Sequence, residues 1–127
     1  MKKVKAKIKR FVKERGWEKQ LPDHVAKSIS IESAELLEIF QWSNPTAKEL
    51  KKDSQKMLEI KGELADILIY AVHLANILEL DIEKIIEAKL LFAAKKYPAK
   101  IMKELSVNSN FAGKEYLKIK KAHRVGK

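Results

Sequence analysis

The fold is decided by two stretches, IESAELLEIF at residues 31–40 and GELADILIYAV at residues 62–72. In each of them apolar residues recur at the three- and four-residue spacing of one helical face. Each stretch also carries two carboxylates three residues apart, so that both members share a face of their helix. These pairs are Glu32 with Glu35, and Glu63 with Asp66. The sequence therefore predicts two long helices that carry acidic side chains beside apolar surface.

Helical patterns continue on both sides of this pair, and no strand-period pattern is found. The predicted helices cover residues 2–18, 22–42, a short segment beginning at Thr46, 55–78 and 81–96, with one or two further turns over 99–105. Pro22 begins the second helix, and Thr46 with Glu49 forms a capping-box pattern. We therefore expect an all-α fold, an antiparallel four-helix-bundle-like domain over residues 1–105. Residues 106–127 are expected to form a basic C-terminal tail that is turn-rich at its start and poorly ordered.

The net charge of +10 is unevenly distributed along the chain. Residues 1–20 carry +7, residues 21–88 carry −6 and residues 89–127 carry +9. An acidic centre suits a cation site, whereas a simple nucleic-acid-binding domain would not need one. The alternative, that the basic ends are solvated helix faces and a loose tail, stays open. There is no cysteine, and no apolar run is long enough to span a membrane. We expect a soluble, cytoplasmic protein with no membrane partner.

The acidic pairs point to a divalent cation. In the predicted 55–78 helix, Glu63 and Asp66 share one stripe with Tyr70 and His73, while the rest of the helix is apolar almost all round. Four carboxylates gathered in a helical core repel one another unless they are protonated or neutralised. Mg²⁺ prefers oxygen ligands and is commonly held by a few carboxylates and substrate phosphates. The alternative, that each pair is an ordinary exposed surface pair, is weakened because two pairs occur on successive apolar helices.

Two lysines extend this hypothesis. Lys89 projects into the apolar stripe of the predicted 81–96 helix, and Lys96 continues the same line. Near clustered carboxylates these ammonium groups are candidate phosphate ligands, although a lysine in an apolar stripe can also extend its charge to solvent.

The strings ESAELLEIFQW and GELADILIY, together with Lys89 and the KKYP of residues 95–98, resemble the MazG-like all-alpha nucleotide pyrophosphohydrolases. The similarity extends from about Phe11 to Pro98 and is greatest to the dCTP pyrophosphatase type. The family motif, Glu-x-x-Glu followed by Glu-x-x-Asp, implies that the Mg²⁺ ligands and catalytic carboxylates are Glu32, Glu35, Glu63 and Asp66. The resemblance also implies that three aromatic side chains lie near the nucleotide, namely Trp17, Trp42 and Tyr70.

The resemblance implies hydrolysis of a nucleoside triphosphate to a monophosphate and pyrophosphate, a nucleotide-pool house-cleaning activity, in a homodimer or homotetramer. Two departures leave base and sugar selectivity open: Gln20, Pro22 and His24 replace a His-x-Pro-x-Asn stretch, and Ala93 replaces an Asn. His73 is expected to be a core or interface histidine. A di-iron bundle is disfavoured, because neither pair shows its Glu-x-x-His pattern. The remaining alternative is a non-catalytic basic protein that binds nucleic acid, a partner that we do not expect.

Overall fold

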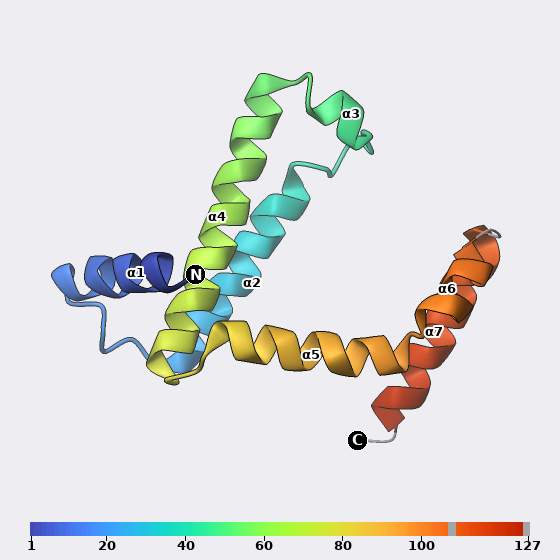
Figure 1. The fold of residues 1–127 in the computed structure, drawn as a ribbon. Helices are drawn as coiled ribbons and strands as arrows, with labels where there is room; N and C mark the ends of the chain where they lie inside the picture. Colours follow the sequence, from blue (N-terminus) through green and yellow to red (C-terminus); the bar gives the residue numbers. More distant parts are fainter. Residues whose placement is uncertain (107–108, 126–127) are drawn as a thin grey trace. The chain divides into compact units, whose positions relative to one another are not determined.

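The computed structural model describes the backbone of residues 1–106 and 109–125, and the side chains of residues 1–104 and 113–124. Within those residues every regular element is a helix and no strand occurs, which confirms the all-α class (Figure 1). The helices are α1 (Lys2–Glu14), α2 (Pro22–Glu38), α3 (Ala47–Leu50), α4 (Ser54–Ile77), α5 (Ile82–Lys96), α6 (Ala99–Ser106) and α7 (Ser109–Val125). The chain divides into two compact units, Met1–Ile82 and Glu83–Lys127, which we describe separately.

The first unit is built on α2 and α4, which lie side by side and run antiparallel (Figure 1). Val25 of α2 is its most deeply buried large side chain. Helix α1 lies across α4, and a small apolar cluster of Ile8, Val12 and Val72 joins the two. Since α1 meets α4 near the C-terminal half of α4, the surface between them adjoins the acidic part of that helix.

Local signals fix the ends of the short connections. The predicted capping box is present: the Glu49 backbone N–H donates to the Thr46 hydroxyl, and the Thr46 backbone N–H donates to the Glu49 carboxylate. The Asp53 carboxylate accepts from the Lys56 backbone N–H at 2.9 Å and begins α4. These caps satisfy backbone donors that have no partner inside their helices.

Two predicted helix ends are corrected. Helix α1 stops at Glu14 rather than at residue 18, because Gly16 adopts a φ of +67° that ends the helical path. Helix α2 stops at Glu38 rather than at Trp42, because the next backbone N–H groups bond three residues back in successive turns. Trp42 therefore does not continue the helical face that carries Glu32 and Glu35.

The second unit contains α5 from Glu83 onward, together with α6 and α7. Helix α7 occupies most of the segment for which the sequence predicts a basic, poorly ordered tail, and a helix over Ser109–Val125 was not predicted. The missed signal is helical spacing of Tyr116, Ile119 and His123. The Tyr116 ring stacks on Tyr97 at 5.3 Å between centroids, and His123 meets Phe92 edge-on at 6.2 Å. Residues 107–108 of the predicted turn-rich stretch lie outside the described residues, and the boundary at residue 105 stays a prediction.

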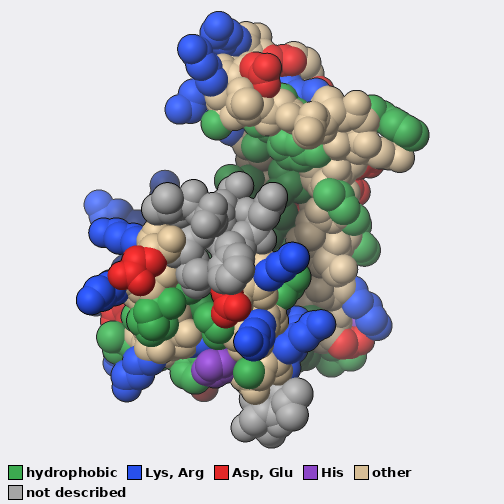
Figure 2. Space-filling model, turned by 90° about the vertical axis from the view of Figure 1, so that its right-hand side faces the viewer, with side chains coloured by type: hydrophobic (Ala, Val, Ile, Leu, Met, Phe, Trp, Pro, Cys, Tyr) green, Lys and Arg blue, Asp and Glu red, His purple; other side chains and the backbone are tan. Residues whose placement is uncertain are grey.

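Large apolar side chains remain on the surface of the first unit. Those on α2 and α4 that are about half exposed or more are Ile31, Leu37, Leu58, Leu64 and Leu68. Apolar side chains lie open between charged ones on the face drawn in Figure 2. Across the described part of the chain only Ile8, Val12, Val25, Val72, Ala75 and His73 are buried. Among the described helices, none is long and apolar enough to cross a membrane.

Candidate metal centre and adjoining pocket

Three of the four predicted carboxylates meet between α2 and α4. Glu32 comes from α2, and Glu63 and Asp66 come from successive turns of α4. One carboxylate oxygen from each of the three lies within 4.8 Å of the others. Because the two helices run antiparallel and pack directly, motifs far apart in sequence face each other. This acidic cluster of Glu32, Glu63 and Asp66 is the candidate metal centre.

The electrostatics of the cluster favour a cation. Burial raises the pKa of Glu32, and the neighbouring charges of Glu35, Asp66 and Glu63 raise it further. Burial likewise raises the pKa of Glu63, with added repulsion from Glu35 and Asp66. Glu35 therefore acts electrostatically on both glutamates, although it is more exposed and lies outside the tight group of three. Each raised pKa reflects first the burial of the carboxylate and then the repulsion of its like-charged neighbours.

A buried carboxylate oxygen without a hydrogen-bond partner also indicates a cation site. The Oε2 atom of Glu63 is buried and has no hydrogen-bond partner among the described residues. Buried carboxylate oxygens are normally hydrogen-bonded or coordinated to a cation, since an unpaired one loses its hydration without compensation. Carboxylate oxygens are also the ligands that Mg²⁺ prefers. The donor set of the acidic cluster therefore fits a hard divalent cation.

A pocket of about 340 Å³ opens beside the acidic cluster, between α1 and α4. Its lining is formed by Phe11, Val12, Trp17, Gln20, Asp66, Ile69, Tyr70 and His73. Asp66 belongs to the acidic cluster and also lines this pocket, so the two adjoin at this residue. Trp17 meets Phe11 edge-on at 6.0 Å, and the left-handed backbone of Gly16 turns the chain so that Trp17 returns against α1. We call this cavity the aromatic pocket.

One polar pair lies in the wall of the aromatic pocket. His73 is 4% exposed, and its Nε2 atom hydrogen-bonds to Gln20 Oε1 at 3.0 Å. An amide oxygen only accepts, so the His73 proton lies on Nε2. Burial lowers the pKa of His73, which favours the neutral imidazole. The prediction that His73 is a core histidine is confirmed. Its hydrogen bond to Gln20 was not predicted, because the two residues lie far apart in the sequence.

Of the five predicted substrate-binding residues, two line the aromatic pocket. Trp17 and Tyr70 both line the aromatic pocket, whereas Trp42 is 89% exposed and does not line it. Lys89 and Lys96 belong to α5 in the second unit, where their ammonium groups lie 5.0 Å from the Phe92 ring and 5.2 Å from the Tyr97 ring. Their approach to phosphate stays a prediction.

Comparison with known proteins identifies the family to which this chain belongs. A model of the MazG-like family matches residues 27–110, more than half of the chain. The chain belongs to the MazG-like family. Both carboxylate pairs of this MazG-like chain fall inside the matched residues.

The MazG-like chain is also similar to the crystal structure of a protein from Archaeoglobus fulgidus that is described as a pyrophosphatase. The two share 35% sequence identity, and the similarity covers 77% of this chain and 92% of the other, with a TM-score of 0.68. No curated protein matches this chain.

Proposed function

We propose that this MazG-like protein is a Mg²⁺-dependent nucleoside triphosphate pyrophosphohydrolase that releases a nucleoside monophosphate and pyrophosphate. One observation carries the proposal: Asp66 belongs both to the acidic cluster and to the lining of the aromatic pocket. A triphosphate needs cations to balance its charge, and a base needs an apolar, aromatic slot. Family membership and the likeness to an Archaeoglobus protein described as a pyrophosphatase support the reaction class. The role would be nucleotide-pool house-cleaning.

Glu32, Glu63 and Asp66 would hold the metal, with Glu35, the fourth predicted ligand, beside them. Bound Mg²⁺ supplies Lewis-acid stabilisation of phosphate oxygens and lowers the pKa of an attacking water. Glu35 is the neighbouring carboxylate outside the tight group, and its charge reaches both Glu32 and Glu63. Glu35 is therefore our candidate to accept the proton of that water, with Glu32 as the alternative.

The aromatic pocket would bind base and sugar. Trp17 and Tyr70 offer aromatic surface, and Phe11 supports Trp17 from the side. Since the phosphates would lie toward Asp66, the base would extend toward α1. The similarity of the sequence to the dCTP pyrophosphatase type makes dCTP the first substrate to test.

We further propose a homodimer or homotetramer. Very few described residues of the first unit are buried. Large apolar side chains on α2 and α4 remain about half exposed or more. Such a surface on a small unit suits burial against a second copy. In the assembly, Trp42 would pack at the nucleotide, and Lys89 and Lys96 would contact the outer phosphates.

The test combines metal binding with turnover. Glu63→Gln and Asp66→Asn should each abolish Mg²⁺ binding by calorimetry and reduce turnover of dCTP by at least about a thousandfold. The matched control is Glu59→Gln, since Glu59 lies one turn earlier on α4, is exposed and pairs only locally with Gln55 at 3.1 Å. This control should bind metal and turn over normally.

Near-normal activity in either cluster variant would remove the metal assignment. The second candidate function, nucleic-acid binding through the basic ends, is favoured by the +7 charge of residues 1–20. It would be supported by absent hydrolysis together with DNA or RNA binding that weakens steeply with salt.

A further inference from the structure

A polar pair lies in the aromatic pocket at the end away from the acidic cluster. His73 follows Asp66 by two helical turns on the same face of α4, so it lies about 10 Å further along that helix, at about 1.5 Å per residue. Gln20, from the connection between α1 and α2, meets it there: the His73 Nε2–H donates to Gln20 Oε1 at 3.0 Å. All three residues line the pocket, so Asp66 and the pair lie at its two ends.

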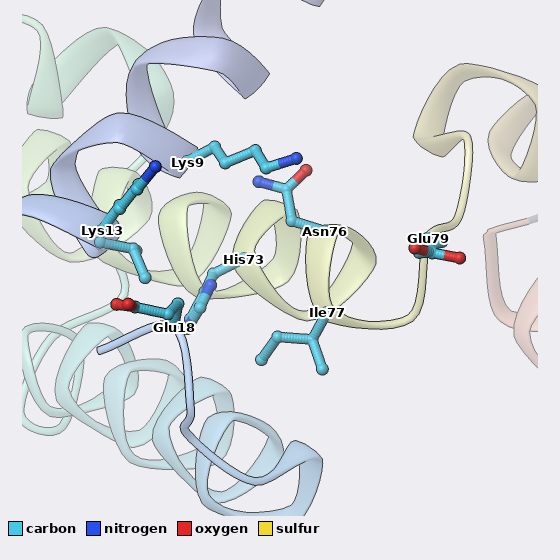
Figure 3. Close-up of a pocket in the computed structure, with 8 residues that line it drawn as sticks. Lys9, Lys13, Glu18, His73, Asn76, Ile77 and Glu79 are labelled. Atoms are coloured by element: carbon cyan, nitrogen blue, oxygen red, sulfur yellow. The ribbon is translucent and has the colours of Figure 1, made fainter. Parts of the chain in front are cut away.

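The position of His73 is fixed by its surroundings. With Val12 it also lines a second cavity, of about 370 Å³, beside Asn76, whose amide atoms are buried. Figure 3 shows His73 projecting from α4 toward the segment that carries Glu18, two residues before Gln20. Because the imidazole is 4% exposed, burial lowers its pKa and favours the neutral form with the proton on Nε2. This proton directs the amide oxygen of Gln20 toward His73.

The amide nitrogen of Gln20 remains available to a ligand. Among the described residues, the only hydrogen bond of this side chain is the one that Oε1 accepts, so the N–H groups of Nε2 have no partner there. Nε2 is also not one of the buried unpartnered atoms of the described residues, and it is therefore accessible. A glutamine amide normally offers both a donor and an acceptor, but here the oxygen is turned to His73 and the donor is left for the pocket.

We infer that Gln20 selects bases that carry a keto group opposite the glycosidic bond. The inference rests on the proposed hydrolysis, because phosphates on a metal at Asp66 would leave the base over Tyr70 and Trp17. The ring position farthest from the sugar then meets Gln20. This is position 4 of a pyrimidine, or position 6 of a purine. The O4 atom of thymine or uracil and the O6 atom of guanine accept a hydrogen bond there, whereas the amino groups of cytosine and adenine donate.

Gln20 would contact the base, and His73 would act as a positioning residue. The Nε2 group of Gln20 donates to a keto oxygen, but it meets an amino group donor against donor and stays unpaired. The indole of Trp17 adds only another N–H donor, so it does not supply the missing acceptor. The difference between a matched and a mismatched base is expected to be roughly tenfold to a hundredfold in affinity. On this account dCTP is a substrate with a lower kcat/KM than dUTP.

The test measures binding of reaction products, which the enzyme does not consume. Two ligand pairs exchange a keto for an amino group: dUMP with dCMP, and dIMP with dAMP. They are titrated with Mg²⁺ into the full chain by calorimetry. The wild type should bind each keto nucleotide roughly tenfold to a hundredfold more tightly than its amino counterpart. The kcat/KM values of the corresponding triphosphates should follow the same order.

Gln20→Glu is the most informative variant. Its carboxylate still accepts from His73 Nε2–H but offers the base acceptors only, so the preference should reverse toward dCMP and dAMP. The ratio of the two affinities is the readout, since an added negative charge weakens binding of every nucleotide. Gln20→Leu serves should the glutamate variant not fold, and its ratio should be close to one. The matched control is Gln55→Glu, since Gln55 is exposed on α4 and does not line the pocket; it should keep the wild-type ratio.

Nitrogen-15 nuclear magnetic resonance of the wild type gives a readout that a merely structural role would not move. His73 must be protonated at Nε2 alone, and the side-chain amide signals of Gln20 must shift on addition of dUMP. The inference is overturned by a proton on His73 Nδ1, by equal affinity or an amino preference in the wild type, by an unchanged ratio in Gln20→Leu, or by no monophosphate binding. A keto preference without triphosphate hydrolysis would refute the proposed function and leave this inference standing, whereas hydrolysis without base preference would do the reverse.

Discussion

Replacing Trp17 by alanine tests the aromatic pocket as the base site. The indole is 47% exposed, and its other half packs against the first unit, including the edge-on contact with Phe11. A base stacked on the open half can bury about 120 Å² of it, taking about 250 Å² for a whole Trp side chain. At about 25 cal/mol per Å², this gives an upper bound of about 3 kcal/mol.

That bound agrees with base–aromatic stacking, which contributes on the order of 1–3 kcal/mol. We therefore expect Trp17→Ala to raise KM for dCTP by roughly fivefold to a hundredfold, at about 1.4 kcal/mol per decade. The kcat should change much less, because stacking is the same in the ground and transition states. The variant should also melt at a lower temperature, since the packed half of the indole is lost as well.

The assay is initial-rate kinetics of pyrophosphate release with Mg²⁺, at a temperature where circular dichroism shows the variant folded. Trp17→Phe is the matched control: it keeps an aromatic face beside Phe11 and should retain most of the affinity. An unchanged KM in folded Trp17→Ala would refute the assignment of this pocket to the base. A loss confined to kcat would refute the stacking role equally.

Three further predictions follow from the acidic cluster, the apolar surface and α5. Glu32 and Glu63 have raised pKa values in the folded protein. In EDTA, their contribution to the free energy of unfolding is therefore greatest below the ordinary pKa of a glutamate, and it is lost as pH rises through the folded-state pKa. As pH rises above the ordinary glutamate pKa of 4.5, the melting temperature of Glu63→Gln should therefore fall less than that of the wild type, and an equal fall would contradict the repulsion argument. Leu68→Glu on the exposed face of α4 should reduce the mass measured by light scattering to that of a monomer, whereas a monomeric wild type would contradict the proposed assembly. Lys89→Ala should raise KM for the triphosphate at least about tenfold, and an unchanged KM would remove Lys89 from the phosphate site.

The acidic cluster could be predicted because its information is local. A spacing of three residues puts Glu63 and Asp66 on one face of α4. Because the rest of α4 is largely apolar, this face is expected to pack against a neighbouring helix. The antiparallel pairing of α2 and α4 then brings in Glu32 from the other motif. Glu35 shares the motif but stays outside the tight group, since a three-residue offset on a helix does not fix how far each side chain reaches.

The aromatic pocket and the second cavity depend on how α1 crosses α4. Helical periodicity identifies the apolar face of α1, but it does not give the crossing position, so neither the Gln20–His73 bond nor the enclosure of Asn76 could be foreseen. Trp42 shows a different limit. Its expected face relied on α2 continuing past Glu38, and hydrogen bonds to residues three positions back ended the helix first. Helix ends depend on such competing local bonds, which composition does not reveal.

The central claim is a metal-dependent cut that releases pyrophosphate, and phosphorus-31 nuclear magnetic resonance of the products tests it most directly. Wild-type protein, Glu59→Gln and Asp66→Asn are incubated with dCTP, with Mg²⁺ or with EDTA, and the phosphorus signals are followed over time. We predict dCMP and pyrophosphate from the first two proteins with Mg²⁺ only, and intact dCTP from Asp66→Asn. Release of single phosphate, hydrolysis that persists in EDTA, or equal turnover by Asp66→Asn would contradict the account.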